Sequence, residues 1–149
     1  MIIDTHCHVY PDKIAQKAAE ATGHFYGIPP RMDGTVETLK QASNQVGIGH
    51  SVINSVATTA HQVASINRYI AATVAENSGT MTGLGTLHPD SEDPEQDIRQ
   101  ILDLGLKGIK LHPYYQGFVL DDPVPLDLFR IARDNGLFVE IHAGFDIGF

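Results

Sequence analysis

The chain opens with Met1-Ile2-Ile3-Asp4-Thr5-His6-Cys7-His8-Val9-Tyr10-Pro11, an apolar start that soon turns polar. If this stretch forms a β-strand, its side chains alternate between two faces, and Asp4, His6 and His8 share the polar one. Two histidines at the end of a strand, with Pro11 as a stop, indicate a metal site at the mouth of a sheet. A His-x-His pair also arises by chance, so the pair needs support from the rest of the chain.

The composition is that of an ordinary soluble globular protein. The 149 residues suffice for a single domain over residues 1–149, and 42% of them are hydrophobic against 19% charged, which argues against disorder. The net charge of −8, without a basic cluster, argues against a nucleic-acid or anionic-membrane partner. No apolar run reaches the ~20 residues of a membrane span, and the N-terminus lacks the features of a signal peptide.

The number of cysteines indicates in which cellular compartment the protein is expected. Cys7 is the only cysteine, so no internal disulfide forms and a cytoplasmic location is expected. We expect a small molecule as the substrate, no nucleic-acid or membrane partner, and leave a homo-oligomer open.

Strand and helix patterns alternate along the chain. The β-rich runs are separated by stretches long enough for a helix, which predicts a parallel sheet. After the first strand we expect strands at residues 50–59, 82–87, 106–111 and 137–141, and helices at residues 12–22, 35–46, 61–77, 91–104 and 123–135.

Five of the eight histidines lie at the C-terminal ends of expected strands, which a random scatter would not produce. A parallel sheet covered by helices on both faces would consist of nearly continuous hydrophobic residues. Polar side chains on one face, gathered at one end of the strands, are instead typical of the inside top of a (β/α)8 TIM barrel. We therefore expect an α/β fold of this barrel type, with a site formed around His6, His8, His88, His112 and His142.

Three segments resemble the amidohydrolase superfamily, namely Asp4-Thr5-His6-Cys7-His8, Gly108-Ile109-Lys110-Leu111-His112-Pro113 and Glu140-Ile141-His142-Ala143-Gly144. The likeness is greatest to its branch of TIM-barrel metal-dependent hydrolases, the amidohydrolase-2 type, which also holds metal-dependent decarboxylases. The resemblance extends from residue 2 to residue 144, which is nearly the whole chain.

The resemblance implies a divalent metal cofactor, and zinc is the expected ion. His6 and His8 would be metal ligands from the first strand, and His142 would be a ligand and a catalytic residue from the fifth. Lys110 lies near the position where some members carry a carboxylated, metal-bridging lysine, which makes it the other candidate catalytic residue.

Several of these residues have a structural alternative. Lys110 points the same way as Glu140 on the neighbouring strand, so an ion pair explains it as well as carboxylation does. His112, His88 and Tyr114 are candidate substrate-binding residues, but hydrogen-bonded structural histidines and loop packing explain them equally well.

Two neighbours of the histidine pair have simpler predicted roles. Asp4 lies on the same face as His6 and would be a hydrogen-bonding partner of the ligands rather than a ligand itself. Cys7 points away from the site, which predicts packing in the core rather than a nucleophile.

Members of the superfamily have eight strands, whereas about five βα units are recognisable here. Barrels of this kind need about 250 residues, so we expect the N-terminal portion of a longer metal-dependent enzyme. In the family pattern, an aspartate that acts on the metal-bound water follows the last strand. The 149 residues alone are therefore expected to show weak or no turnover.

Three functions stay open at this point. The first is a metal-dependent hydrolase, in which the metal lowers the pKa of bound water toward ~7 and polarises an amide or ester-like carbonyl. The second keeps the metal but removes carbon dioxide from a cyclic carboxylate without oxidation. The third is a noncatalytic fragment or subunit that assembles with a partner chain.

Overall fold

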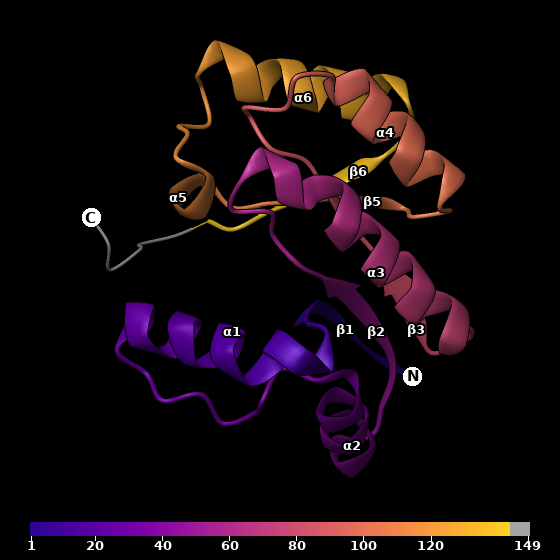
Figure 1. Cartoon of the computed structure of the whole chain (residues 1–149). Coiled ribbons are helices and arrows are strands. Elements are labelled where there is room, and N and C mark those ends of the chain that lie inside the picture. The colour runs from indigo at the N-terminus through magenta and orange to yellow at the C-terminus, as the bar shows by residue number, and fades with distance from the viewer. Residues whose placement is uncertain (144–149) are drawn as a thin grey trace.

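A computed structural model describes residues 1–143, and strands alternate with helices along that length (Figure 1). The strands are β1 (Ile2–His8), β2 (Ile48–Asn54), β3 (Met81–Gly83), β4 (Gly85–Thr86), β5 (Gly108–Leu111) and β6 (Phe138–Ile141). The helices are α1 (Asp12–Tyr26), α2 (Val36–Val46), α3 (Val63–Glu76), α4 (Pro94–Asp103), α5 (Pro113–Gln116) and α6 (Pro123–Asp134), with a 3-10 turn η1 (Ala60–Gln62) before α3. Within this range no helix has both the length and the apolar character that crossing a lipid bilayer requires.

All strands are parallel and follow one another in chain order. They form two three-stranded sheets, β1-β2-β3 and β4-β5-β6, which Leu84 separates. The N–H of Leu84 donates to the carbonyl of Ile53 at 2.9 Å, and Gly83 accepts from the N–H of Lys107 at 3.2 Å. The expected strand at residues 82–87 is therefore a bent segment that bonds to β2 on one side and to β5 on the other. This order is that of a barrel wall, because a doubly wound sheet reverses its strand order near the middle.

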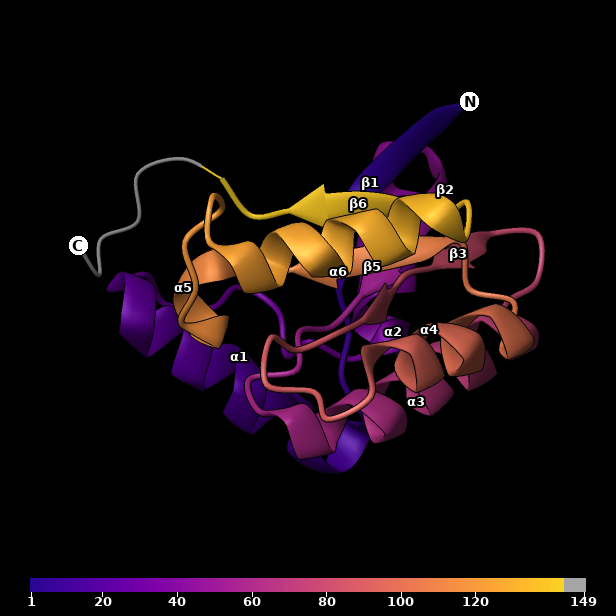
Figure 2. The same cartoon turned by 90° about the horizontal axis from the view of Figure 1, so that it is seen from above.

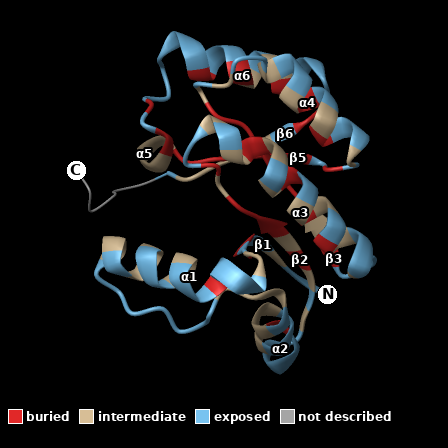
Figure 3. Ribbon diagram, in the orientation of Figure 1, coloured by how far each residue is buried: buried red, intermediate tan, exposed pale blue. Residues whose placement is uncertain are grey.

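Helices cover the outer face of this wall. α3 lies against β3 and β4, α4 lies against both α3 and α6, and α6 contacts β6. Figure 2 shows these three helices beside the strands, whereas α1 and α2 accompany β1 and β2 in Figure 1. The core lies between strands and helices (Figure 3) and includes the buried side chains of Ile53, Ile70, Ile101, Ile109 and Leu128.

The first helix extends beyond its expected end. Residues 12–22 were expected to be helical with Gly23 as the stop, but α1 continues to Tyr26 and ends at Gly27, which has φ 64°. Gly23 has a different reason to be glycine, because a Cβ there would lie 2.6 Å from the carbonyl oxygen of Ile28 and 2.7 Å from Cδ of Pro30. The returning loop therefore packs directly on the helix backbone.

Side-chain caps account for two further differences from the expected helices. α4 begins at Pro94 rather than at Ser91, since Asp93 Oδ1 accepts the backbone N–H of Gln96 at 2.9 Å. The short helix α5 forms where a loop was expected, because the His112 side chain caps its first turn.

Cys7 lies in the core, as its place on the first strand predicted. It is 5% exposed, and its Sγ is 3.9 Å from the carbonyl oxygen of Asp4. Loss of water around the thiol, together with the nearby charge of Asp4, raises the pKa of Cys7 to about 12. The thiol is therefore not a nucleophile near neutral pH.

Asn67 ties α3 to the backbone of β4. It is 0% exposed, its Oδ1 accepts the N–H of Thr86 at 2.8 Å, and its Nδ2 donates to the carbonyl of Thr86 at 3.2 Å. A side chain thus completes the hydrogen bonding of a short strand at the point where the wall bends.

Replacement of Asn67 by alanine should destabilise the protein. Both Thr86 backbone groups would lose a buried partner, and each such group costs about 1–3 kcal/mol, so the free energy of unfolding should fall by about 3 kcal/mol. Urea unfolding followed by circular dichroism measures this change. Asn44→Ala, at an exposed position in α2, is the matched control and should change stability by less than about 0.5 kcal/mol. Equal losses in the two variants would contradict the assigned role of Asn67.

The buried thiol should resist alkylation. At about pH 8 the native protein should react with iodoacetamide far more slowly than the urea-unfolded chain, because only the thiolate reacts and Cys7 forms it only as the pH approaches 12. Unfolding returns the pKa toward the ordinary value, so the rate should rise on unfolding at the same pH. Mass spectrometry of samples quenched at intervals measures both rates. Matching rates would show that Cys7 is not buried in solution.

Candidate metal and substrate site

A cavity of about 600 Å³ opens at the C-terminal ends of β1 and β5, bordered by α1 and the loop that follows it. Strand ends of the barrel wall supply its polar side, and α1 with residues 28–35 supplies the opposite side. We call it the histidine cavity, because four of the histidines that the sequence placed at strand ends line it, namely His6, His8, His112 and His142.

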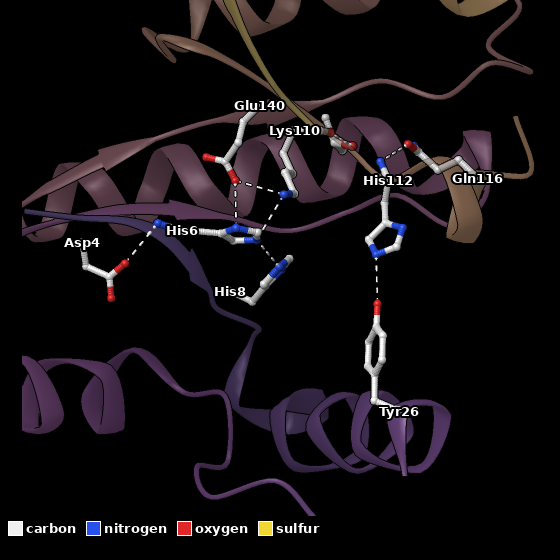
Figure 4. Close-up of polar contacts among 9 residues, drawn as sticks. Asp4, His6, His8, Tyr26, Lys110, His112, Gln116 and Glu140 are labelled. Carbon is white, nitrogen blue, oxygen red and sulfur yellow. Dashed lines mark hydrogen bonds and ion pairs between the residues drawn. The ribbon is translucent and has the colours of Figure 1, made fainter. Parts of the chain in front are cut away.

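His6 and His8 approach each other in this cavity (Figure 4), as the alternation of the first strand predicted. Their Nε2 atoms are 3.0 Å apart and their ring centroids 4.9 Å apart. Asp4 Oδ1 accepts the backbone N–H of His6 at 3.1 Å. Asp4 is therefore a partner of His6, as expected, but it holds the backbone rather than the ring.

Lys110 lies beside His6 and is completely buried. Its Nζ donates to Glu140 Oε1 at 3.0 Å and to His6 Nε2 at 3.1 Å (Figure 4). The register of β5 and β6 places Lys110 opposite Glu140. The ion pair that the sequence left as an alternative is thus present, and carboxylation and a catalytic role of Lys110 stay predictions.

The partners of His6 define its tautomer. An ammonium group can only donate, so His6 Nε2 accepts from Lys110 and the proton of the neutral ring is on Nδ1. That nitrogen lies 3.5 Å from Glu140 Oε1. His6 Nε2 also faces His8 Nε2, although a ring nitrogen has a single lone pair to offer. Two groups therefore compete for one acceptor.

Both rings of the pair are neutral near pH 7. Partial loss of water and the charge of Lys110 lower the pKa of His6, against a smaller opposing effect of Glu140. Loss of water in the cavity, followed by the proximity of His6 and Lys110, lowers the pKa of His8. The neutral imidazole is the form that binds a metal ion.

The His6–His8 pair fits two ligands of a divalent metal. Two metal–nitrogen bonds of about 2.05 Å that meet at the tetrahedral angle place their nitrogen atoms about 3.3 Å apart. The two Nε2 atoms are separated by 3.0 Å, and a cation shared between them would take the place of the hydrogen bond from Lys110 to His6 Nε2. Among residues 1–143, no three His, Cys, Asp or Glu side chains are arranged to hold a metal ion. The described part of the chain therefore offers a pair of ligands rather than a complete set.

His142 lines the cavity but does not join this pair in a metal-binding group. Its ring stacks on His112, with centroids 4.1 Å apart and an interplanar angle of 8°. Its backbone N–H donates to the carbonyl of Leu111 at 3.1 Å, so it follows β6 at the expected place. Because β6 pairs with β5, the ring next to His142 is that of His112, which follows β5. The expected set of three metal ligands, His6, His8 and His142, is therefore not assembled in residues 1–143.

His112 is held by contacts on several sides, and it is only 3% exposed. Its ring also stacks on Tyr115 with centroids 4.0 Å apart, and its Nε2 lies 3.3 Å from the hydroxyl of Tyr26 (Figure 4). Its backbone N–H donates to Gln116 Oε1 at 2.9 Å. The ring is thus both fixed and presented to the cavity, as a substrate contact requires.

Some residues around the cavity were missed by the sequence patterns. Tyr26 and Arg31 lie beyond the expected end of the first helix, where no periodicity marks them. Gln116 follows His112 by four residues in a stretch expected to be a loop. Pro113, a residue favoured in the first turn of a helix, was the signal that could have revealed α5.

Two of the expected substrate-binding residues lie elsewhere. His88 is 4% exposed and borders a separate cavity of about 650 Å³ with His61 and Asp90, whose backbone N–H donates to His88 Nδ1 at 3.1 Å. Tyr114 packs against Phe25, with ring centroids 4.7 Å apart, and Tyr115 lines the histidine cavity instead. The conformation of the loops that follow the strands, rather than the strands themselves, determines where the side chains of His88 and Tyr114 lie.

Sequence comparison reveals relatives of this chain. A family model described as Amidohydrolase matches residues 3–149. The 2-amino-3-carboxymuconate-6-semialdehyde decarboxylase of Dictyostelium discoideum is 38% identical over 79 residues, which cover 52% of this chain and 22% of that protein.

Solved structures share the fold. The 5-carboxyvanillate decarboxylase of Sphingomonas paucimobilis superposes with a TM-score of 0.69 at 22% identity, over 95% of this chain and 51% of that one. A variant of the 5-carboxyvanillate decarboxylase of Novosphingobium aromaticivorans, with bound manganese, gives a TM-score of 0.70 at 18% identity, over 95% and 50%. The chain spans about half the length of these structures, and its parallel wall is that of an amidohydrolase TIM barrel. Because the family model matches nearly every residue, the chain belongs to the amidohydrolase family.

Proposed function

We propose that this chain carries the metal-binding and substrate-binding residues of a metal-dependent decarboxylase for a cyclic carboxylate. The observation that carries the proposal is the approach of His6 Nε2 and His8 Nε2 to 3.0 Å inside a cavity at the strand ends. The decarboxylases among the relatives support this reaction over the hydrolysis that the sequence left open.

His6 and His8 would hold the divalent ion. Zinc suits imidazole ligands, and the manganese in a structural neighbour makes that ion the other candidate. When bound, the ion supplies positive charge that orients the substrate carboxylate and stabilises negative charge on the ring. Glu140 neutralises Lys110 at 3.0 Å, so a cation at His6 would not face an uncompensated ammonium group.

Arg31 gives the cavity a group suited to a carboxylate. It lines the cavity, and no ion pair within residues 1–143 engages it. A guanidinium binds a carboxylate through two parallel hydrogen bonds. The rings of Tyr26 and Tyr115 add flat apolar surface for a cyclic substrate.

Decarboxylation breaks the carbon–carbon bond to the carboxylate and forms a carbon–hydrogen bond in its place, so the site must deliver a proton. His142 lines the cavity and is our candidate for this role. Its stacking on His112 fixes the ring plane from which the proton would be delivered.

Metal binding should depend on the histidine pair. Titration of MnCl2 into chelator-treated protein, followed by calorimetry, should show binding that His8→Ala weakens by more than about 100-fold, because one of two neighbouring ligands is lost. His24→Ala, at an exposed position on α1, should bind as the wild type does. Unchanged binding by His8→Ala would place the metal elsewhere in the protein.

Carbon dioxide release from a panel of aromatic and cyclic carboxylates tests the reaction. Because the 149 residues alone are expected to show weak or no turnover, the effect of Arg31 is measured as binding by calorimetry. Arg31→Gln should raise the Kd of a cyclic carboxylate by about 10- to 100-fold, the equivalent of a lost charged hydrogen bond of about 1.5–3 kcal/mol. Arg68→Gln, exposed on α3, is the matched control. Metal-dependent cleavage of amides or esters without carbon dioxide release would instead support a hydrolase.

A further inference from the structure

Asn54, the last residue of β2, is buried with its side-chain amide unpaired. It is 0% exposed, and within residues 1–143 neither its Oδ1 nor its Nδ2 has a hydrogen-bond partner. Burying a polar group in this way is unfavourable, so native amides are normally paired. Asn67 is equally buried and makes two hydrogen bonds. The unpaired amide is therefore particular to Asn54.

The strand register places Asn54 beside a candidate metal ligand. β1 and β2 pair in parallel with Asn54 opposite His8, and the N–H of Val9 donates to the carbonyl of Asn54 at 3.2 Å. Residues paired across a ladder have their side chains on the same face of the sheet. Asn54 and His8 therefore share the face of the wall that carries the histidine pair.

His8 is the ligand whose second ring nitrogen needs a partner. Its Nε2 faces His6, so on metal binding through Nε2 its proton would be on Nδ1. A metal-binding imidazole almost always donates its other N–H to an oxygen. His6 has such an oxygen in Glu140, 3.5 Å from its Nδ1, whereas the described residues provide no hydrogen bond to His8 Nδ1.

On the basis of the proposed function, we infer that Asn54 is the positioning residue of His8. Its Oδ1 accepts the Nδ1–H of His8 when His8 binds a divalent ion through Nε2. Asn54 Oδ1 and His8 Nδ1 are each bonded to Cγ, so both atoms are three bonds from the Cα atom of their residue. Paired strands lie about 4.8 Å apart, so rotation of the side chains suffices to bring them together. The bond satisfies the buried amide oxygen and fixes the tautomer of His8.

Two variants of Asn54 separate this role from a structural one. Asn54→Leu keeps the approximate shape but removes both polar atoms, and it should bind Mn²⁺ about 10- to 100-fold more weakly than the wild type in a MnCl2 titration. Asn54→Asp keeps an acceptor at the same place and should bind within about tenfold of the wild type. The metal-free Asn54→Leu protein should unfold at the same urea concentration as the wild type or at a higher one, because two unpaired polar atoms are gone.

The opposite pair of results would overturn the inference. Loss of stability in metal-free Asn54→Leu would show that the amide has a structural partner, and unchanged Mn²⁺ affinity would show that it does not support His8. Asn67→Ala is the matched control, since it should lose stability but retain the affinity of the wild type. Absence of metal binding by the wild-type protein would overturn the proposed function and this inference with it, whereas unchanged binding by Asn54→Leu overturns the inference alone.

A measurement on the wild type covers the case in which the leucine variant does not fold. In the Zn²⁺-loaded protein, nitrogen-15 NMR should show His8 protonated at Nδ1, with that proton protected from exchange with water. Exchange at the rate of an exposed imidazole would overturn the inference without any variant.

Discussion

Lys110 and Glu140 form an ion pair across neighbouring strands, and the arrangement of the histidine cavity depends on it. A buried ammonium group needs a close counter-charge, and loss of one partner from such a pair costs about 3–5 kcal/mol. The pair forms because β5 and β6 are parallel and in register, so the two side chains lie on one face. The same rule places Asn54 beside His8 between β1 and β2. Strand pairing thus determines which residues lie next to His6 and His8, the two histidines that line the cavity.

The parts of the site that the sequence predicted are those that strand geometry alone determines. Alternation of side chains placed His6 and His8 on one face, and the structure brings them together in the cavity. It also buries Cys7 in the core as predicted, although Cys7 borders the cavity as well. Alternation in two further strands predicted that Lys110 and Glu140 could form an ion pair, and the structure contains this pair. Alternation could not exclude carboxylation of Lys110. The two-residue period of a β-strand does not depend on loop conformation, which explains why these positions could be predicted from the sequence.

Residues beyond the strand ends were not predictable in the same way. His88 and His142 both follow a strand, yet one borders a separate cavity and the other stacks on His112. Their side-chain directions depend on loop conformation and on aromatic neighbours, for which a single sequence has no periodic signal. Asn67 likewise acts through a contact between a helix and a strand that only the folded chain brings together. The fold class was predicted because the repeated order of strand and helix survives such local uncertainty.

The close packing at Gly23 has a consequence for how the shape of the histidine cavity could change. The loop after α1 carries Arg31 and contacts the helix backbone at Gly23, where even a methyl group would meet a carbonyl oxygen at 2.6 Å. Any larger residue there must push the loop outward and so change the shape of the cavity, which Gly23 and Arg31 both line. Divergence among related chains could therefore proceed through this packing contact, with the histidines and Arg31 retained.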